Sequence, residues 1–323
     1  MTDLAEAAPA RAGAAPERPV SRLGGLRSRR RKEALWFYLF ASPWIIGFLV
    51  FLFGPMIASI YLSLTDWDSF TAPNWVGLDN YRQLLTEDPV FWSSLWNTVY
   101  YAAVSVPLGL LLGLWLANLL NKHVRARKLF RTLIYLPTLV PLVAAAMVFK
   151  MVLAPSGAVN DLLGLVGISG PSWLLDPVWV KPSLILLSVW GVGSATVLLL
   201  AAMKGIPREL YEAAEVDGAG SIRQFWSITV PQLTPIIFFN LVMGLIGAFQ
   251  VFSQVYVLTR GRTQAPEDAS QTMVPYLFDQ AFAFYHMGYA SAISWLLFVV
   301  ILGFTLIAFR TARRWVFYET EVK

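Results

Sequence analysis

The chain has 323 residues, of which 57% are hydrophobic and only 14% are charged, and its net charge is +5. Soluble domains carry about 25% charged residues, so this composition excludes an ordinary cytosolic enzyme, a disordered chain and a nucleic-acid binder of the basic-patch kind. The chain has no cysteine, which excludes disulfides, cysteine-ligated zinc, iron–sulfur clusters and thiol catalysis. Most of the chain is therefore expected to lie in a bilayer.

The first segment, residues 1–33, is rich in Ala, Pro, Gly and Arg and has no apolar period, so a disordered tail is expected. A secretory signal is the alternative, because basic residues precede an apolar run. The uncharged run from Ala34 to Leu64 is much longer than a signal core, and no small-residue cleavage site follows it. The basic cluster from Arg27 to Lys32 is better interpreted as a topology anchor beside anionic lipid.

Six uncharged apolar runs follow the tail, and about 20 such residues suffice to cross a bilayer as a helix. Buried core helices are the alternative, but six of them would leave no polar surface to cover them. We therefore predict an all-α membrane protein whose membrane domain covers residues 34–311, followed by a cytoplasmic tail at 312–323. Prolines inside the runs, such as Pro137 and Pro141, should kink or locally open the helices. The predicted spans are residues 35–64, 97–120, 132–153, 182–203, 234–258 and 290–310.

The basic residues are distributed unequally between the two sides of these spans. Twenty Lys and Arg residues fall on the side of the two termini and five on the other. Since cytoplasmic loops carry the excess of Lys and Arg, both termini are expected in the cytoplasm.

The residues that several kinds of binding and catalysis require are absent from this sequence. No G-x-x-x-x-G-K-[ST] run occurs, so the chain is not expected to bind a nucleotide through a phosphate loop or to be an enzyme. The two histidines, His123 and His286, belong to no metal-spaced cluster; we expect a solvated side chain for the first and an interfacial one for the second. No acidic residue lies at mid-depth in a predicted span, which weakens a proton- or sodium-coupled carrier.

The loop between the fourth and fifth spans, residues 205–231, has the most informative pattern. Pro207 suits a first helical turn, Glu209 and Glu212 favour the positive helix start, and Gly218 suits a left-handed stop. The pattern predicts an acidic helix of two to three turns. An amphipathic loop on the bilayer surface is the alternative, but acidic residues fit poorly beside a negatively charged leaflet. A protein partner fits better.

The residues of this loop carry a family resemblance. Glu212-Ala213-Ala214, Asp217-Gly218-Ala219 and Ile228-x-Val230-Pro231 resemble the E-A-A-x-x-x-G-x9-I-x-L-P loop of ABC importer permeases, with Val230 where the pattern usually has Leu. In that family the loop helix docks in a cleft of the cytoplasmic ATPase subunit. The resemblance therefore implies a coupling role for Glu212, Ala213, Ala214, Glu215, Asp217, Gly218 and Pro231.

Other segments are similar to the sugar-importer branch, which includes the maltose and glycerol-3-phosphate permeases. The resemblance covers about residues 35–310. One departure is Arg260-Gly261-Arg262, where the branch commonly has a G-G-P turn. The similar segments are residues 76–81, 97–98, 130–132, 136–137, 157–162, 256–259 and 287–292.

The resemblance implies a six-helix, type I importer permease-like fold that forms half of a heterodimeric pore for a sugar or oligosaccharide. Its implied partners are a second, related permease, a cytoplasmic ATPase dimer, an extracytoplasmic solute-binding protein and membrane lipid, with no nucleic acid. No cofactor is expected in this chain, since ATP and Mg would belong to the partner ATPase. The expected location is the cell membrane of a bacterium or archaeon.

A transient sugar site between helices needs amides, hydroxyls and aromatic faces rather than charges. Candidates for the substrate path are Trp190, Ser194, Gln250, Ser253 and Gln254; the alternative is that these side chains only join helix to helix. An importer of another solute, such as a peptide, an amino acid or a glycerophosphate, stays open, although a phosphate would need cations and only Lys150 comes near a span. A stand-alone secondary carrier is a further alternative.

Overall fold

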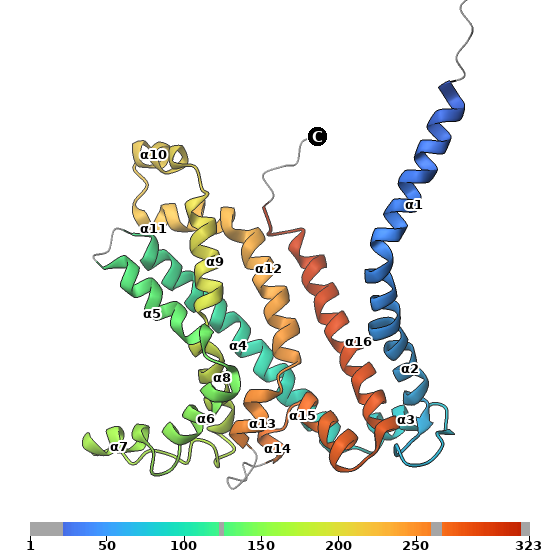
Figure 1. Cartoon of the computed structure of the whole chain (residues 1–323). Coiled ribbons are helices and arrows are strands. Elements are labelled where there is room, and N and C mark those ends of the chain that lie inside the picture. Colours follow the sequence, from blue (N-terminus) through green and yellow to red (C-terminus); the bar gives the residue numbers. More distant parts are fainter. Residues whose placement is uncertain (1–21, 123–125, 260–266, 318–323) are drawn as a thin grey trace, which may run out of the picture. The chain divides into compact units, whose positions relative to one another are not determined.

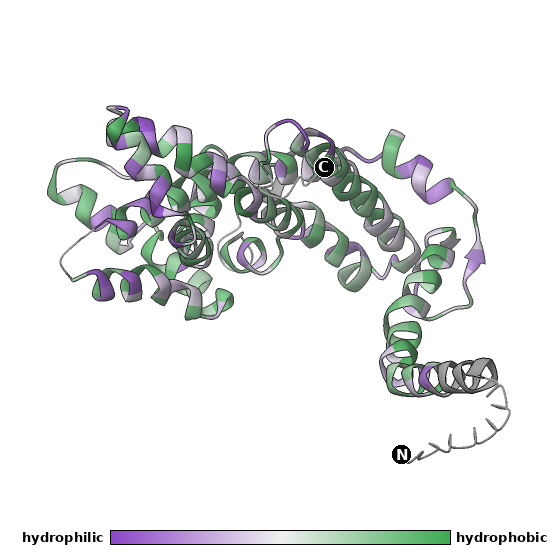
Figure 2. Cartoon of the chain, turned by 90° about the horizontal axis from the view of Figure 1, so that it is seen from above, coloured by the Kyte–Doolittle hydropathy of each residue, from purple (hydrophilic) through white to green (hydrophobic). Residues whose placement is uncertain are grey.

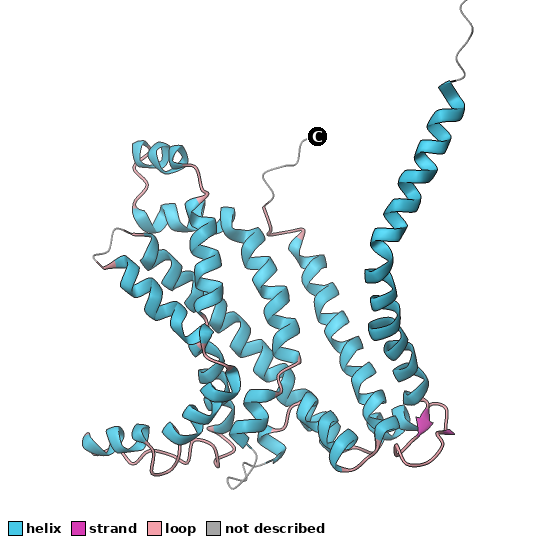
Figure 3. Cartoon of the chain, in the orientation of Figure 1, coloured by secondary structure: helices cyan, strands magenta, loops and turns pink. Residues whose placement is uncertain are grey.

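The computed structural model describes residues 22–122, 126–259 and 267–317. It separates into two units, residues 1–58 and 59–323. His123 and the segment Arg260-Gly261-Arg262 lie outside the described residues. Among the described residues, helices dominate both units, and a single two-stranded hairpin is the only sheet (Figure 3).

The first unit is a long helical rod. It consists of α1 (Arg22–Phe48), a π-helical turn (Leu49–Phe53) and the first part of α2 (Gly54–Ser63). The helical run Glu33–Ser63 is long and apolar enough to span a bilayer. α1 begins at Arg22, so residues 22–33, expected to be disordered, are helical. Arg and Lys are good helix formers and extend an existing helix without the cost of a new nucleus.

The second unit contains the remaining elements, which Figure 1 shows in chain order. β1 and β2 pair antiparallel, with Thr65 opposite Trp75. The elements are β1 (Thr65–Asp66), β2 (Asn74–Trp75), α3 (Asp79–Thr86), α4 (Pro89–Asn121), α5 (Arg127–Leu139), α6 (Leu142–Val152), α7 (Ala158–Leu165), α8 (Val180–Trp190), α9 (Gly193–Lys204), α10 (Arg208–Val216), α11 (Ser221–Gln224), a π turn (Phe225–Thr229), α12 (Val230–Phe249), α13 (Ser253–Thr259), α14 (Glu267–Ser270), α15 (Met273–Phe278), a π turn (Asp279–Ala283) and α16 (Met287–Ala312).

The predicted all-α membrane architecture is confirmed. Within the part of the chain that the structure describes, four continuous helical segments are long and apolar enough to span a bilayer: Glu33–Ser63, Pro89–Asn121, Ser221–Phe249 and Met287–Ala312. Two bent pairs, α5 with α6 and α8 with α9, raise the number to six when each pair counts as one span. Figure 2 shows that hydrophobic residues predominate along the long helices.

The third and fourth predicted spans are broken rather than continuous. α5 and α6 meet at 98° and α8 and α9 at 45°. Pro141 explains the first break: the residue before a proline is driven from helical to extended backbone, and Val140 has φ −78° and ψ 127°. The second break lies at Gly191 and Val192, between the ends of the two helices.

The second and fifth predicted spans differ from the structure at their ends. α4 begins at Pro89 rather than near residue 97, because the Asp88 side chain accepts hydrogen bonds from the amides of Val90 and Phe91 and so caps the helix. The fifth helical run ends at Phe249, and α13 is a separate short helix. Apolar residues continue across this last break, so composition alone did not reveal it.

α4 is the helix around which the second unit packs. It contacts α8, α9 and α12, while α12 also contacts α16. Small residues let the backbones approach closely: Ala102 and Ala117 of α4 are fully buried, and a Cβ added to Gly113 would contact Val192 at 3.4 Å. The large buried side chains around α4 include Leu184, Leu187, Leu199, Leu233, Phe249 and Ile293.

Candidate functional site

A cavity of about 320 Å³ lies where broken helices meet. The α5–α6 break contributes Thr138 and Val140, the α8–α9 break contributes Trp190 and Gly191, and α13 contributes Gln254. Non-helical backbone at membrane depth is tolerated where it is buried in protein or lines a cavity. Both helix breaks contribute residues to the lining of this cavity. The remaining lining residues are Pro137, Leu142, Ala145, Leu187, Ser188 and Ser194.

The cavity wall is polar at a few defined positions. Gln254 is buried, and its Nε2 donates a hydrogen bond to the hydroxyl of Tyr101. Tyr101, on α4, is only 3% exposed, and its hydroxyl also interacts with the side chains of Ser188 and Ser105. A buried polar network of this kind joins three helices, α4, α8 and α13.

The structure brings together three of the five substrate-path candidates. Trp190, Ser194 and Gln254 line the cavity. Gln250 is the exposed residue that ends α12, and Ser253 is the first residue of α13; neither lines the cavity. Sequence reasoning did not single out Tyr101 or Ser188, because nothing in an apolar span signals which of its polar residues face one another.

Trp190 stands between this cavity and a second one of about 470 Å³ with an almost entirely apolar lining. Pro137 and Trp190 line both cavities. The indole ring packs edge-on against Phe149, with 5.5 Å between the ring centroids, and is 39% exposed. Trp190 therefore packs against an apolar neighbour on one side and presents surface to the polar cavity on the other.

None of the described residues that line the polar cavity carries a charge. Lys150, in the last turn of α6, donates from Nζ to the carbonyl oxygen of Val257 at 3.0 Å and is not part of the lining. The cavity thus offers amide, hydroxyl and indole groups. Such groups hydrogen-bond to, or stack on, a neutral hydroxylated ligand and give no counter-charge to an ionic one.

The loop 205–231 contains the predicted helix, α10. Pro207 directly precedes it, and Asp217 follows its last residue. Gly218 has φ +74°, its amide bonds to the Glu215 carbonyl at 3.0 Å, and the amide of Ala219 bonds to the Ala214 carbonyl at 2.8 Å. This is the left-handed helix stop that the sequence predicts.

α10 has no buried residue in this chain, and Val216 at its end is 89% exposed. Of the coupling residues inferred from the resemblance, Glu212 to Glu215 lie on α10, Asp217 and Gly218 end it, and Pro231 lies on α12. Arg208 Nε lies 3.9 Å from Glu212 Oε1, both side chains being largely exposed, so this pair adds little stability. Figure 1 shows α10 projecting beyond α9 and α11 at one end of the second unit.

One side-chain contact ties α10 to the fifth span. The hydroxyls of Tyr211 and Thr229 are 2.8 Å apart, and Thr229 ends the π turn that leads into α12. In that turn the amide of Val230 bonds five residues back, to Phe225, directly before Pro231, which has no amide hydrogen to continue the helical ladder. The Tyr211–Thr229 contact thus links α10 to the π turn that leads into α12.

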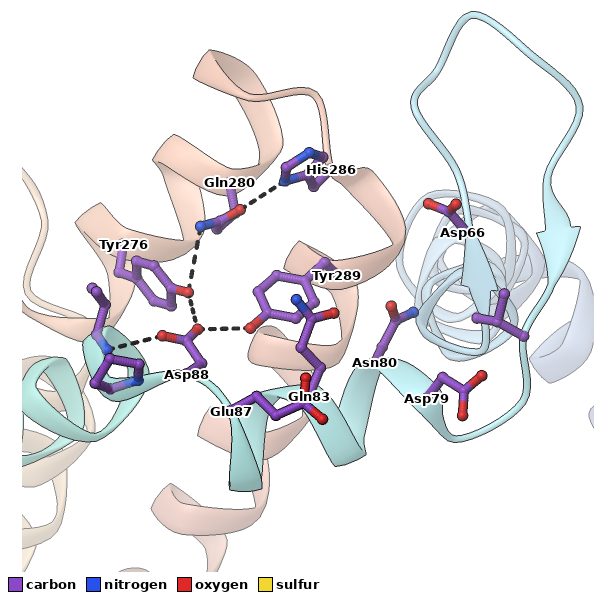
Figure 4. A pocket seen from close by; sticks show the side chains of 13 residues that line it. Asp66, Asp79, Asn80, Gln83, Glu87, Asp88, Tyr276, Gln280, His286 and Tyr289 are labelled. Carbon is purple, nitrogen blue, oxygen red and sulfur yellow. Dashed lines mark hydrogen bonds between the residues drawn. The ribbon is translucent and has the colours of Figure 1, made fainter.

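A polar pocket of about 580 Å³ lies near α3, α15 and the start of α16 (Figure 4). Figure 1 shows these elements at the end of the second unit opposite α10. Asp88 is its central group: besides capping α4, its Oδ2 accepts hydrogen bonds from Tyr276 and, at 2.6 Å, from Tyr289. Gln280 and His286 continue the chain of hydrogen bonds. Burial and the bond to Asp88 raise the pKa of the Tyr276 hydroxyl, which keeps it a donor. The network joins α4, α15 and α16.

Metal ligands do not assemble in the part of the chain that the structure describes. No three His, Asp or Glu side chains there come together in a way that could hold a metal ion.

Comparison with known proteins identifies the family. Residues 109–315 match the model of the binding-protein-dependent transport system inner membrane component. The chain is 44% identical to a probable ABC transporter permease, YesP, of Bacillus subtilis, over 90% of this chain and 94% of the relative. It is 35% identical to the lactose transport system permease LacF of Rhizobium radiobacter, over 85% and 93%. It is also 35% identical to the trehalose/maltose permease MalF of Thermococcus litoralis, over 87% and 95%.

A solved structure shares the fold. A chain of a bacterial ABC transporter that imports the acidic polysaccharide alginate superposes with a TM-score of 0.76 at 28% identity, covering 88% of this chain and 98% of that one. The same kind of transporter has been solved with an alginate pentasaccharide-bound periplasmic protein. The chain therefore belongs to the binding-protein-dependent transport system inner membrane components, the multi-pass membrane permeases of ABC importers.

Proposed function

We propose that this chain forms half of the translocation pore of an ABC importer for a neutral sugar or oligosaccharide. The observation that carries the substrate class is the cavity at the helix breaks, whose lining combines Gln254, Ser188, Ser194 and Trp190 with no charged side chain. The named relatives support it, since two of them transport lactose and trehalose or maltose. The polar cavity would bind the sugar weakly and transiently between the two halves of the pore.

The proposal also includes partner subunits. No residue of α10 is buried in this chain, and the resemblance of loop 205–231 to the permease coupling loop supports a cytoplasmic ATPase dimer as its partner. ATP and Mg would bind to that ATPase, and this chain would need no cofactor. A second permease would complete the pore, and an extracytoplasmic solute-binding protein would deliver the sugar, as the periplasmic protein in the alginate transporter complex suggests.

In this mechanism the ATPase acts through α10. Closure of the ATPase pair would displace α10, and the Tyr211–Thr229 bond together with the helical path into α12 would pass that displacement to the fifth span. The spans would then rotate largely as rigid bodies between inward- and outward-facing states. Both termini and α10 would lie in the cytoplasm, and the pocket around Asp88 on the outer side.

The test is uptake by intact cells that differ only in this chain. A deletion strain and the same strain complemented with the chain receive labelled neutral di- and trisaccharides, glycerol 3-phosphate and a tripeptide. We expect deletion to lower uptake of one neutral saccharide at least tenfold and complementation to restore it. Loss confined to glycerol 3-phosphate, which a relative 30% identical to this chain transports, or to the peptide would contradict the proposed substrate class.

A further inference from the structure

Tyr101 occupies a position behind the cavity wall. It belongs to α4, the long helix that contains no break, and its side chain is buried. It is not among the residues that line the cavity. Its hydroxyl nevertheless interacts with two that are, Gln254 and Ser188.

The hydrogen bond sets which way the Gln254 amide points. Its Nε2 is the atom that donates to Tyr101, so the amide oxygen is the atom left for another partner. Among the residues that the structure describes, the Gln254 amide oxygen has no hydrogen-bond partner. It is also not one of the fully buried polar atoms that lack a partner. A side-chain amide offers a carbonyl acceptor and two N–H donors; with one donor bound to Tyr101, the oxygen is free to accept a hydroxyl group from a ligand in the cavity.

Gln254 needs this support because of where it lies. α13 has only seven residues and follows the break after Phe249, so the backbone around Gln254 lacks the rigidity of a long helix. Val255 and Leu258 fix α13 by burial, but they leave the rotation of the Gln254 side chain open. The hydroxyl on α4 supplies the missing constraint.

We propose that Tyr101 is a positioning residue of the substrate path: it holds the Gln254 amide so that its oxygen accepts a hydrogen bond from one hydroxyl of the transported sugar. This inference rests on the proposed function. It assigns part of the sugar selectivity to a side chain that does not touch the sugar.

The test compares Tyr101→Phe with Tyr100→Phe. Both remove one hydroxyl from neighbouring positions of α4, but Tyr100 is 36% exposed and lies outside the network. Each variant, and wild type, is measured in the complementation strain with the transported sugar and with its series of monodeoxy analogues. Uptake is normalised to the amount of the chain in the membrane.

In wild type, one deoxy analogue should be imported about two- to tenfold less well than the sugar, the range that one net hydrogen bond allows. Tyr101→Phe should reduce this discrimination toward one, and Tyr100→Phe should leave it unchanged. Gln254→Ala should abolish it, and adding Tyr101→Phe to Gln254→Ala should have no further effect on the ratio, because both changes remove the same interaction.

A purely structural role for Tyr101 would lower uptake of the sugar and of every analogue by the same factor, and that result would overturn the proposal. Unchanged discrimination in Tyr101→Phe would overturn it too, while sugar uptake by wild type and Tyr100→Phe would leave the proposed function intact. Failure of wild type to import any saccharide would instead contradict the proposed function, and the positioning role with it.

Discussion

Asp88 joins three segments that are far apart in the chain. One carboxylate oxygen caps α4, through the amides of Val90 and Phe91 at 2.9 and 3.0 Å, and the other accepts the hydroxyls of Tyr276 and Tyr289. Hydrogen bonds to a charged group contribute about 1.5–3 kcal/mol each. Asp88 therefore stabilises the packing of α15 and α16 on the start of α4.

We expect Asp88→Ala to lower the thermal unfolding temperature of the detergent-purified protein markedly, because it removes the cap and leaves two tyrosine hydroxyls without their acceptor. Asp88→Asn should be intermediate, since its oxygen can cap α4 while its NH₂ group cannot accept from a tyrosine. Asp66→Ala is the control: Asp66 lines the same pocket and is exposed. Equal shifts for Asp88→Ala and Asp66→Ala would show that the network stabilises nothing.

A second prediction at the level of single residues concerns Gly193. It begins α9, and a Cβ there would overlap the carbonyl oxygen of Ile134 and lie 2.9 Å from Thr138 Cγ2. Since both atoms belong to α5, even an alanine would push α9 and α5 apart, at a cost of about 1–3 kcal/mol. Gly193→Ala should reduce both unfolding temperature and uptake.

Gly109→Ala is the matched control, because a Cβ at that position of α4 has nothing within 4 Å. Helical propensity alone would make both substitutions stabilising. If Gly193→Ala raises the unfolding temperature as Gly109→Ala should, the close approach of α9 to α5 does not constrain this site.

Part of the cavity could be predicted from residue types, and part could not. Trp190, Ser194 and Gln254 are polar or aromatic residues in apolar spans, a contrast that is visible in the sequence. Tyr101 is also a polar aromatic residue in an apolar span, but its role depends on its distance from Gln254, which is more than 150 positions away in the chain and on another helix. Gln250 and Ser253 have the right chemistry, but they lie at the break between α12 and α13 and are not part of the lining.

At the level of the elements, α10 depends on how it ends. Gly218 has a left-handed backbone, and a Cβ there would meet nothing within 4 Å. The requirement for glycine is thus conformational in this chain: a β-branched residue in the left-handed region costs about 1–2 kcal/mol. A substitution would change the direction in which the chain leaves α10.

We expect Gly218→Val to abolish co-purification of the ATPase and sugar uptake while leaving membrane insertion intact, and Gly218→Asn to retain part of both, since Asn tolerates this backbone. Gly220→Val is a close control: Gly220 lies in the same loop, also has open space around its Cβ, and has an extended backbone with φ −70° and ψ 165°. If the valines at 218 and 220 have the same effect, the left-handed stop is not what the partner requires.

The prolines predicted where helices bend or break, but not the angle of the bend. Pro137 and Pro141 mark the third span as kinked, yet the observed turn is 98°, and α4 continues through Pro107 without a break in its helix. Two of the π turns end two residues before a proline, at Pro55 and Pro231. The break at Val140 follows from the steric effect of Pro141 on the residue before it, and the two π turns precede residues that have no amide hydrogen; none of these effects fixes the angle of a bend.

At the scale of the whole molecule, the charge distribution predicts which ends of the second unit face the cytoplasm. The strands β1 and β2 lie at the opposite end of this unit from α11 (Figures 1 and 3). Asn74 belongs to β2 and Ser221 to α11, and both residues are exposed. Because the chain has no cysteine, a single introduced cysteine reports on one position alone. Gln264, an outer position by the same argument, lies outside the described residues.

Asn74→Cys should react with an impermeant thiol reagent added to intact cells, and Ser221→Cys should react only after the membrane is permeabilised. Ser28→Cys, in the basic part of α1, should behave like Ser221→Cys. The reverse pattern of labelling would place the termini and α10 outside and would remove the basis for an ATPase partner at loop 205–231.

The bend between α5 and α6 also bears on how the chain enters the membrane during synthesis. The two helices have 13 and 11 residues, about 20 and 16 Å at 1.5 Å per residue, so neither reaches across about 30 Å of hydrocarbon. Neither half can leave the insertion machinery as an independent span. The helices that pack on the pair, α9 on α5 and α13 on α6, are synthesised after it. The third span should consequently be the slowest of the spans to resist extraction from the membrane. A chain truncated after it should be recognised by quality-control proteases.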